Sequence, residues 1–176
     1  MAIKGKRIII KQTIREDLEN IKCLWNNVEV MKWVGFPAGI DQNINDLKEW
    51  WEKIQQNEKT HHFVVYTKKN DNFCGELYYK KDAKHKRAGL DIKLLPQMQG
   101  RGLATESLQL LISYIFKNEP QIEAVWTEPS EENAAARKLY SRCGLKSKER
   151  PTDMKPAASY WELTRKDWQK NNSNFR

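Results

Sequence analysis

The hydrophobic pattern changes its period at Pro96, and this change limits the folds that the chain can adopt. Before Pro96, three stretches have the apolar, β-branched and aromatic character of strands, at 62–67, 73–79 and 88–95. After it, apolar residues recur at the spacing of one helix face: Leu103, Leu108, Leu111, Ile112, Ile115 and Phe116. We therefore expect an antiparallel meander followed by an amphipathic helix that begins near Gly102.

The remaining segments extend this pattern on both sides. We expect further strands at 7–13, 122–127, 146–150 and 159–164. We expect further helices at 41–56 and 131–143, and a first helix that follows the capping residues 13–17 and carries the apolar stripe from Leu18 to Val28. The order of these elements predicts an α/β fold, with a mixed sheet and helices on its faces.

Length, cysteine content and charge set broad limits. A chain of 176 residues suits one domain, with a core over about 7–168 and a polar tail at 169–176. Three cysteines within structured segments favour reduced thiols, and no stretch reaches the ~20 apolar residues of a membrane helix. We expect a cytoplasmic monomer or homodimer that spans no membrane. The net charge of +8 is scattered, so it fits a solvated basic surface or a phosphate-rich small molecule.

The loop at 96–105 is the strongest functional signal. It lies between an expected strand and an expected helix, and Gly100 and Gly102 let its backbone bend and approach a ligand closely. Free N–H groups at a helix start favour phosphate. Thr105 stands where a dinucleotide fingerprint has its third glycine, and the Gly-Lys-Ser/Thr ending of a nucleoside-triphosphate loop is absent. The loop predicts an anion site for a ligand other than NAD or ATP.

Two blocks resemble the GCN5-related N-acetyltransferase (GNAT) family. Residues 99–104 match the family's phosphate loop, Gln/Arg-x-x-Gly-x-Gly/Ala. Residues 133–145 are similar to its Asn-x-x-Ala-x-x-x-Tyr-x-x-x-Gly-Phe helix, with Leu145 in place of the phenylalanine. The resemblance covers about 7–168 and implies acetyl-CoA as cosubstrate, bound where an α/β sheet is splayed.

The resemblance also implies which residues hold the cofactor. In order along the chain they are Ile92, Leu94, Gln99, Gly100, Arg101, Gly102, Leu103, Ala104, Thr105, Asn133, Ala136 and Tyr140. The backbone of 99–104 and the Thr105 hydroxyl would hold the pyrophosphate, and Asn133 would contact the pantetheine arm. The main chain near 92–95 would pair with that arm like an added strand.

Catalytic candidates follow from helical spacing and from the needs of the reaction. Asn133, Ala136 and Tyr140 share one helix face, and a tyrosine hydroxyl with a pKa of roughly 10 could protonate a departing thiolate. Tyr140 is therefore the expected general acid. An incoming amine must lose a proton before it attacks, and Asp91 and Glu76 on adjacent expected strands are the candidate bases.

Other chemistries find little support. The cysteines lack a nucleophile motif, and His61 and His62 would point to opposite faces of a strand, so they would not bind one metal ion together. We predict no metal site. The chain also lacks a recognisable nucleic-acid motif, so we do not expect a nucleic-acid partner.

The acceptor is less clear than the cofactor. The aromatic loop that holds Trp33 and Phe36 would contact substrate, or would simply pack in the core. Residues 160–168 resemble the branch that acetylates the N-termini of ribosomal proteins, and 127–130 are similar to aminoglycoside acetyltransferases. We expect transfer of an acetyl group to a primary amine, of a protein N-terminus or a small molecule. The alternatives are an aminoglycoside 6'-type N-acetyltransferase and a catalytically silent acyl-CoA-binding module.

Overall fold

A single mixed sheet organises the part of the chain that the computed structural model describes, residues 2–155 and 157–173. Its strands lie in the order β1-β2-β3-β4-β5-β6-β8-β7, and each neighbouring pair is antiparallel except β5 and β6. The strands are β1 Ala2–Lys4, β2 Ile8–Gln12, β3 Thr60–Thr67, β4 Phe73–Asp82, β5 Arg87–Leu94, β6 Ala124–Thr127, β7 Lys146–Ser147 and β8 Trp161–Thr164.

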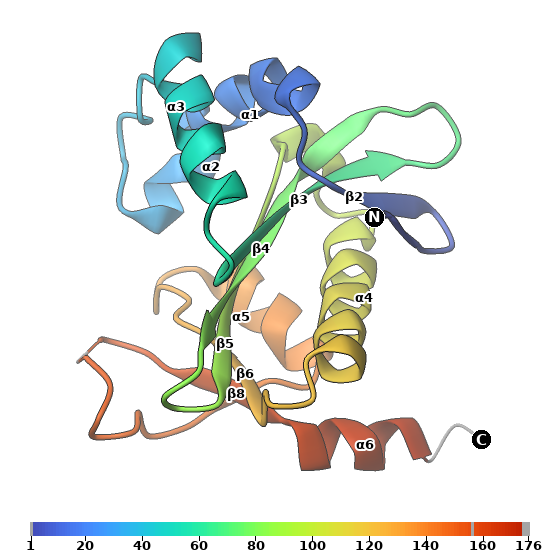
Figure 1. Ribbon diagram of the computed structural model, residues 1–176, viewed down its shortest axis with the longest axis vertical. Coiled ribbons are helices and arrows are strands. Elements are labelled where there is room, and N and C mark those ends of the chain that lie inside the picture. Colours follow the sequence, from blue (N-terminus) through green and yellow to red (C-terminus); the bar gives the residue numbers. More distant parts are fainter. Residues whose placement is uncertain (1, 156, 174–176) are drawn as a thin grey trace.

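Helices connect these strands and cover both faces of the sheet (Figure 1). They are α1 Leu18–Trp25, α2 Val28–Met31, α3 Ile44–Gln55, α4 Leu103–Asn118, α5 Ala134–Arg142 and α6 Arg165–Ser173. Three short 3-10 turns are also present: Arg15–Asp17 leads into α1, Lys32–Val34 follows α2, and Pro96–Met98 lies between β5 and α4. The predicted α/β class, the mixed sheet and the helices on both faces are confirmed. No helix within the described residues is long and apolar enough to cross a membrane.

The alternation of β3 explains why both faces need cover. Phe63 and Val65 point into the main core, which they share with the apolar face of α4, whereas Val64 packs with Leu18, Ile21 and Leu47 beneath α1 and α3. Successive side chains of a strand point to opposite faces, so one apolar run supplies two cores. The helix pattern expected after Pro96 is confirmed, since Leu108, Leu111, Ile112, Ile115 and Phe116 are all buried.

The sheet is splayed between β5 and β6, as expected. The two strands are parallel and pair only at 87–89 with 124–126. From Leu90 to Leu94, the edge of β5 that faces β6 has no strand partner among the described residues. Its backbone N–H and C=O groups on that side therefore need a partner other than a neighbouring strand.

Some boundaries differ from those expected. The first helix ends at Trp25 because the Asn27 side chain accepts a hydrogen bond from Val30 N, at 3.3 Å, and starts α2 as a separate helix. The second begins at Ile44, because Asn43 caps it. The strand expected at 146–150 is only two residues long.

The two ends of the chain also differ from expectation. The hairpin strand β1 was not predicted. The expected polar tail at 169–176 is helical as far as Ser173, and 174–176 lie outside the described residues. Arg165 anchors this helix, since its guanidinium donates to the carbonyl oxygens of Phe116, Glu119 and Ile122. The cysteines are free, as expected.

Candidate active site

The loop before α4 is shaped for a ligand by its glycines. Gly100 and Gly102 both have a φ of +72°, a left-handed conformation that side chains disfavour. Gly102 is the N-cap of α4 and offers no side-chain cap, so the first N–H groups of the helix lack an intrahelical acceptor. Together with the helix dipole, these groups make the loop an anion site.

Arg7 holds this loop from behind. Its guanidinium donates to Arg101 O at 2.6 Å, to Gly102 O at 3.0 Å and to Glu106 Oε2 at 2.8 Å, and its backbone N donates to Glu106 Oε1 at 2.8 Å. The loop carbonyls are thus engaged by an arginine that lies 94 residues earlier in the chain. Sequence reasoning missed this support, because Arg7 reads only as the start of a strand.

A cavity of about 630 Å³ runs from this loop along the unpaired edge of β5 to α5. Every residue that the family resemblance assigned to the cofactor lines it except two. Leu103 is buried in the main core, and the Arg101 carbonyl is engaged by Arg7. Gln99 lines the cavity and also ties the loop to β5, with its Nε2 donating to Leu94 O at 2.9 Å.

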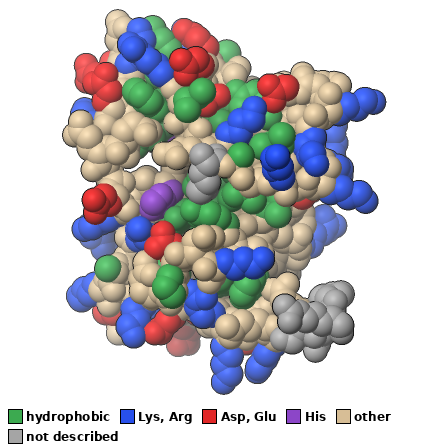
Figure 2. Space-filling view, turned by 45° about the vertical axis from the view of Figure 1, so that its right-hand side comes forward, with side chains coloured by type: hydrophobic (Ala, Val, Ile, Leu, Met, Phe, Trp, Pro, Cys, Tyr) green, Lys and Arg blue, Asp and Glu red, His purple; other side chains and the backbone are tan. Residues whose placement is uncertain are grey.

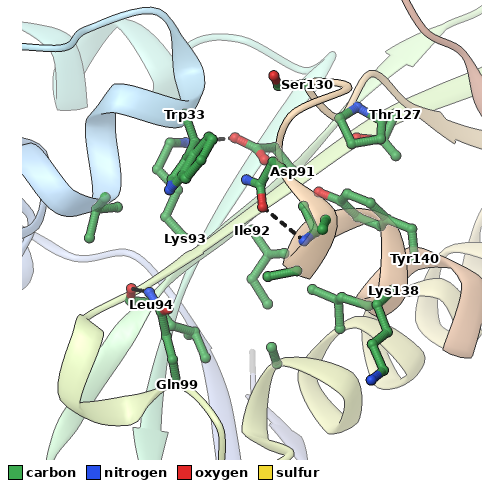
Figure 3. A pocket seen from close by; sticks show the side chains of 18 of the residues that line it. Trp33, Asp91, Ile92, Lys93, Leu94, Gln99, Thr127, Ser130, Lys138 and Tyr140 are labelled. Atoms are coloured by element: carbon green, nitrogen blue, oxygen red, sulfur yellow. Dashed lines mark hydrogen bonds and ion pairs between the residues drawn. The ribbon is translucent and has the colours of Figure 1, made fainter.

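Helix α5 forms the opposite wall. Asn133 caps it, with its Oδ1 accepting from Ala136 N at 3.0 Å, and Ala136 and Tyr140 follow on the cavity side. Tyr140 is 3% exposed and directs its hydroxyl toward β5 (Figure 3). Burial raises its pKa, the Asp91 charge raises it further, and a hydrogen bond with Thr127 acts in the opposite direction. Tyr140 therefore keeps its proton at neutral pH and can donate a hydrogen bond.

A second cavity, of about 840 Å³, adjoins the first. The two share six lining residues: Trp33, Val34, Asp91, Thr127, Glu128 and Ser130. Figure 3 shows Trp33, Asp91 and Thr127 around the point where they meet. Trp33 thus lines both cavities, and its contact with substrate stays a prediction. Phe36 lines neither cavity and is 46% exposed.

The two candidate bases lie in one charged network but have different access. Lys93 Nζ is 2.7 Å from Asp91 Oδ2 and 3.2 Å from Glu76 Oε1. The Asp91 side chain is 24% exposed and lines both cavities, whereas the Glu76 side chain is 1% exposed and lines neither. Only Asp91 is placed to meet a substrate amine.

Glu76 is instead the centre of a buried polar cluster. It accepts a hydrogen bond from Trp25 Nε1 at 2.8 Å and lies 3.1 Å from His62 Nε2, while His62 Nδ1 is 2.7 Å from Thr13 Oγ1. Burial alone would raise the pKa of Glu76, but Lys93, His62 and the hydrogen bonds outweigh it and lower the pKa to about 2. As predicted, His61 points to the other face of the sheet; there it stacks on Tyr79.

Comparison with known proteins agrees with this geometry. The fold and the splayed site define an acyltransferase of the GNAT type, and residues 7–146 match the Acetyltransferase (GNAT) domain. The chain belongs to this family. A spermidine N(1)-acetyltransferase of Escherichia coli K12 is 29% identical over 132 residues, which are 74% of this chain and 68% of that protein.

Two solved structures share the fold at low sequence identity. The spermidine N-acetyltransferase of Vibrio cholerae, in complex with CoA and spermine, has a TM-score of 0.80 and 20% identity, over 94% of this chain and 99% of that chain. The ribosomal L7/L12 α-N-protein acetyltransferase RimL, in complex with CoA, has a TM-score of 0.79 and 12% identity, over 95% and 99%.

Proposed function

We propose that this enzyme binds acetyl-CoA in the first cavity and transfers the acetyl group to a primary amine that enters through the second. The observation that carries the proposal is the meeting of the two cavities at Asp91 and Thr127, beside the Tyr140 hydroxyl. The anion site at one end of the first cavity suits the pyrophosphate. The unpaired edge of β5 at 90–94 offers backbone partners to the amides of the pantetheine arm.

Asp91 is the residue that we assign to the amine. A primary amine arrives mostly as an ammonium ion and must give up a proton before its lone pair can attack the thioester carbon. Asp91 faces both cavities, and Lys93 fixes one of its oxygens at 2.7 Å. Its carboxylate would take this proton and pass it to solvent.

Tyr140 is assigned to the leaving group. As the new C–N bond forms and the C–S bond breaks, the electron pair of the broken bond stays on sulfur. The Tyr140 hydroxyl, kept protonated by burial, would donate its proton to that sulfur as general acid. Nitrogen loses two protons in all: Asp91 would pass the first to solvent, and the second, lost as the C–S bond breaks, would replace through solvent the proton that Tyr140 gives to the CoA thiolate.

An assay of released CoA tests the proposal. The purified protein is incubated with acetyl-CoA and a panel of primary amines, and mass spectrometry locates the acetyl group on the acceptor. We expect transfer to at least one class of amine, as the similarity to a spermidine acetyltransferase supports. Binding of acetyl-CoA without transfer to any amine would instead identify a catalytically silent acyl-CoA-binding module.

A further inference from the structure

The second cavity has an aromatic lining whose rings already face cations of the protein. Tyr78, Trp126 and Trp33 line it, and the Trp126 ring lies against the sheet where Gly89 leaves room, since a Cβ there would be 3.1 Å from the ring. Lys93 lies 5.6 Å from the Tyr78 ring centre, Arg150 5.5 Å from that of Trp126, and Lys32 5.4 Å from that of Trp33. The rings therefore offer apolar surface more than sites for a further cation.

The acidic side chains of this cavity are also engaged. Asp91 pairs with Lys93, Glu128 pairs with Arg150, and Asp82 Oδ2 lies 2.6 Å from His85 Nδ1. A polycationic acceptor would need free carboxylates along its length, because each ammonium group that leaves water requires a counter-charge. In this cavity, each carboxylate already has a partner from the protein.

Most lysines that line the second cavity, in contrast to its carboxylates, form no ion pair within the described residues. Lys59, Lys80, Lys81 and Lys84 line the same cavity, and only Lys81 forms an ion pair within the described residues, with Glu119 at 3.3 Å. Lys59, Lys80 and Lys84 are exposed; Lys59 lies directly before β3, Lys80 on β4 and Lys84 in the turn that follows β4. The unbalanced charge in this cavity is therefore positive.

On the face of the molecule in Figure 2, Lys and Arg side chains are interspersed with Asp and Glu. A general excess of basic residues would attract any anion to any part of the surface. The relevant feature of the second cavity is local: its carboxylates have partners, whereas the ammonium groups of Lys59, Lys80 and Lys84 form no ion pair with any residue that the structure describes. Such an arrangement selects ligands by charge complementarity and disfavours like charges.

We infer that the acceptor is a primary amine that also carries an anionic group, a carboxylate or a phosphate, separated from the amine by an apolar body. This inference rests on the proposed function. The amine lies at Asp91, where the two cavities meet, the apolar body lies on Tyr78 and Trp126, and the anion lies among Lys59, Lys80 and Lys84. Spermidine, spermine and aminoglycosides, which lack an anion and carry several cations, fit this cavity poorly.

Matched acceptors provide the test. The tripeptides Ala-Glu-Glu, Ala-Gln-Gln and Ala-Lys-Lys share one N-terminal amine and differ in the charge of their side chains. Spermidine and an aminoglycoside represent polycations. Phosphoethanolamine and ethanolamine differ by one phosphate group, so this pair tests phosphate as the anion. We expect kcat/KM to favour Ala-Glu-Glu over Ala-Lys-Lys by about tenfold or more, and salt to reduce this preference, because charges at a rim steer association. Higher kcat/KM for the polycations, or equal values for the three tripeptides, would overturn the inference.

A charge-reversed variant tests the named lysines. The triple variant Lys59→Glu, Lys80→Glu, Lys84→Glu should keep its affinity for CoA and reverse the ranking of Ala-Glu-Glu and Ala-Lys-Lys. Lys117→Glu, which changes an exposed lysine of α4 outside both cavities, should leave the ranking unchanged. An unchanged ranking in a folded triple variant would refute the assignment. Failure of the wild-type protein to acetylate any amine, although it binds acetyl-CoA, would refute the proposed function itself.

Discussion

The two cavities differ in the parts of the chain that line them. The first cavity, proposed for acetyl-CoA, includes three backbone features: the loop around Gly100 and Gly102, the unpaired edge of β5 and the first turn of α5. The second cavity, proposed for the acceptor, is lined largely by charged and aromatic residues from β4, β5, β6, the turn after β4 and the 3-10 turn that holds Trp33, with Lys59 just before β3. A main-chain site needs particular backbone angles, whereas a side-chain site can change its specificity by substitution without disturbing the fold. Changes to the first cavity should therefore affect CoA, and changes to the second should affect the amine.

The largest effect is expected at the main-chain site. Gly102→Asp would place a side chain at φ +72°, with its Cβ 3.1 Å from Arg7 Nη2, and a negative charge at the proposed phosphate site. We expect CoA affinity to fall by about 100-fold or more. Calorimetry on a variant shown by circular dichroism to be folded measures this. Wild-type affinity would mean that phosphate binds elsewhere.

The buried network behind the acceptor cavity should affect stability more than binding. The pKa of Glu76 is lowered from 4.5 to about 2, so the stability that it contributes is present above pH 4.5 and is lost as pH falls toward 2. The gap in unfolding free energy between wild type and Glu76→Gln should therefore narrow by about 2 kcal/mol between pH 5 and pH 3. Urea denaturation measures the gap, and a constant gap would contradict the role given to this carboxylate.

Tyr140 lines the first cavity beside Thr127, where the two cavities meet, and its hydroxyl should affect neither binding step. Tyr140→Phe removes one hydroxyl and keeps the buried ring, so CoA affinity and acceptor KM should stay close to wild type. General acid catalysis contributes about 10² to 10⁴ in rate, so kcat should fall by at least about tenfold. Single-turnover rates across pH test this. Equal rates would show that water protonates the thiolate.

Substitution of Arg7 tests whether the support of the loop at 99–104, apart from its glycines, contributes to CoA binding. Arg7→Gln removes the donors to Arg101 O and Gly102 O, which frees the loop without adding charge to the cavity. We expect CoA affinity to fall by about fivefold, with kcat largely retained, because lost preorganisation weakens binding. Lys11→Gln, which breaks an exposed ion pair between Lys11 on β2 and Asp71 in the turn before β4, is the matched control and should bind CoA normally.

The smallest effect is expected at Trp33. The ring is 41% exposed and lines both cavities, so Trp33→Ala should raise the acceptor KM by about threefold and leave CoA affinity unchanged. Loss of folding would support a packing role instead. A rise in the dissociation constant of CoA that matched the rise in KM would show that the two cavities are not separate in function.

The loop and helix beside the first cavity could be predicted from the sequence, whereas the lysines of the second cavity could not, for a physical reason. Residues 99–104 form one contiguous pattern whose glycines have a backbone role, so the loop and its helix could be recognised directly. Lys59, Lys80 and Lys84 are separated in the sequence, and only the pairing of the strands brings them to the rim of one cavity. Helix α6 was missed because its sequence is polar, and Arg165 anchors it through carbonyl groups about 40 to 50 residues away.

The short ladder between β5 and β6 has a thermodynamic consequence. Within the described residues, three rungs join the strands that precede α4 to those that follow it. Under the proposed function, acetyl-CoA would lie along the next part of that seam and contact β5 on one side and α5 on the other. A ligand that binds only when β5 and α5 are held together adds RT ln(1 + [L]/Kd) to the stability of the folded protein, where [L] is the ligand concentration. The cohesion between the two halves of the sheet would then rise and fall with the concentration of the cosubstrate.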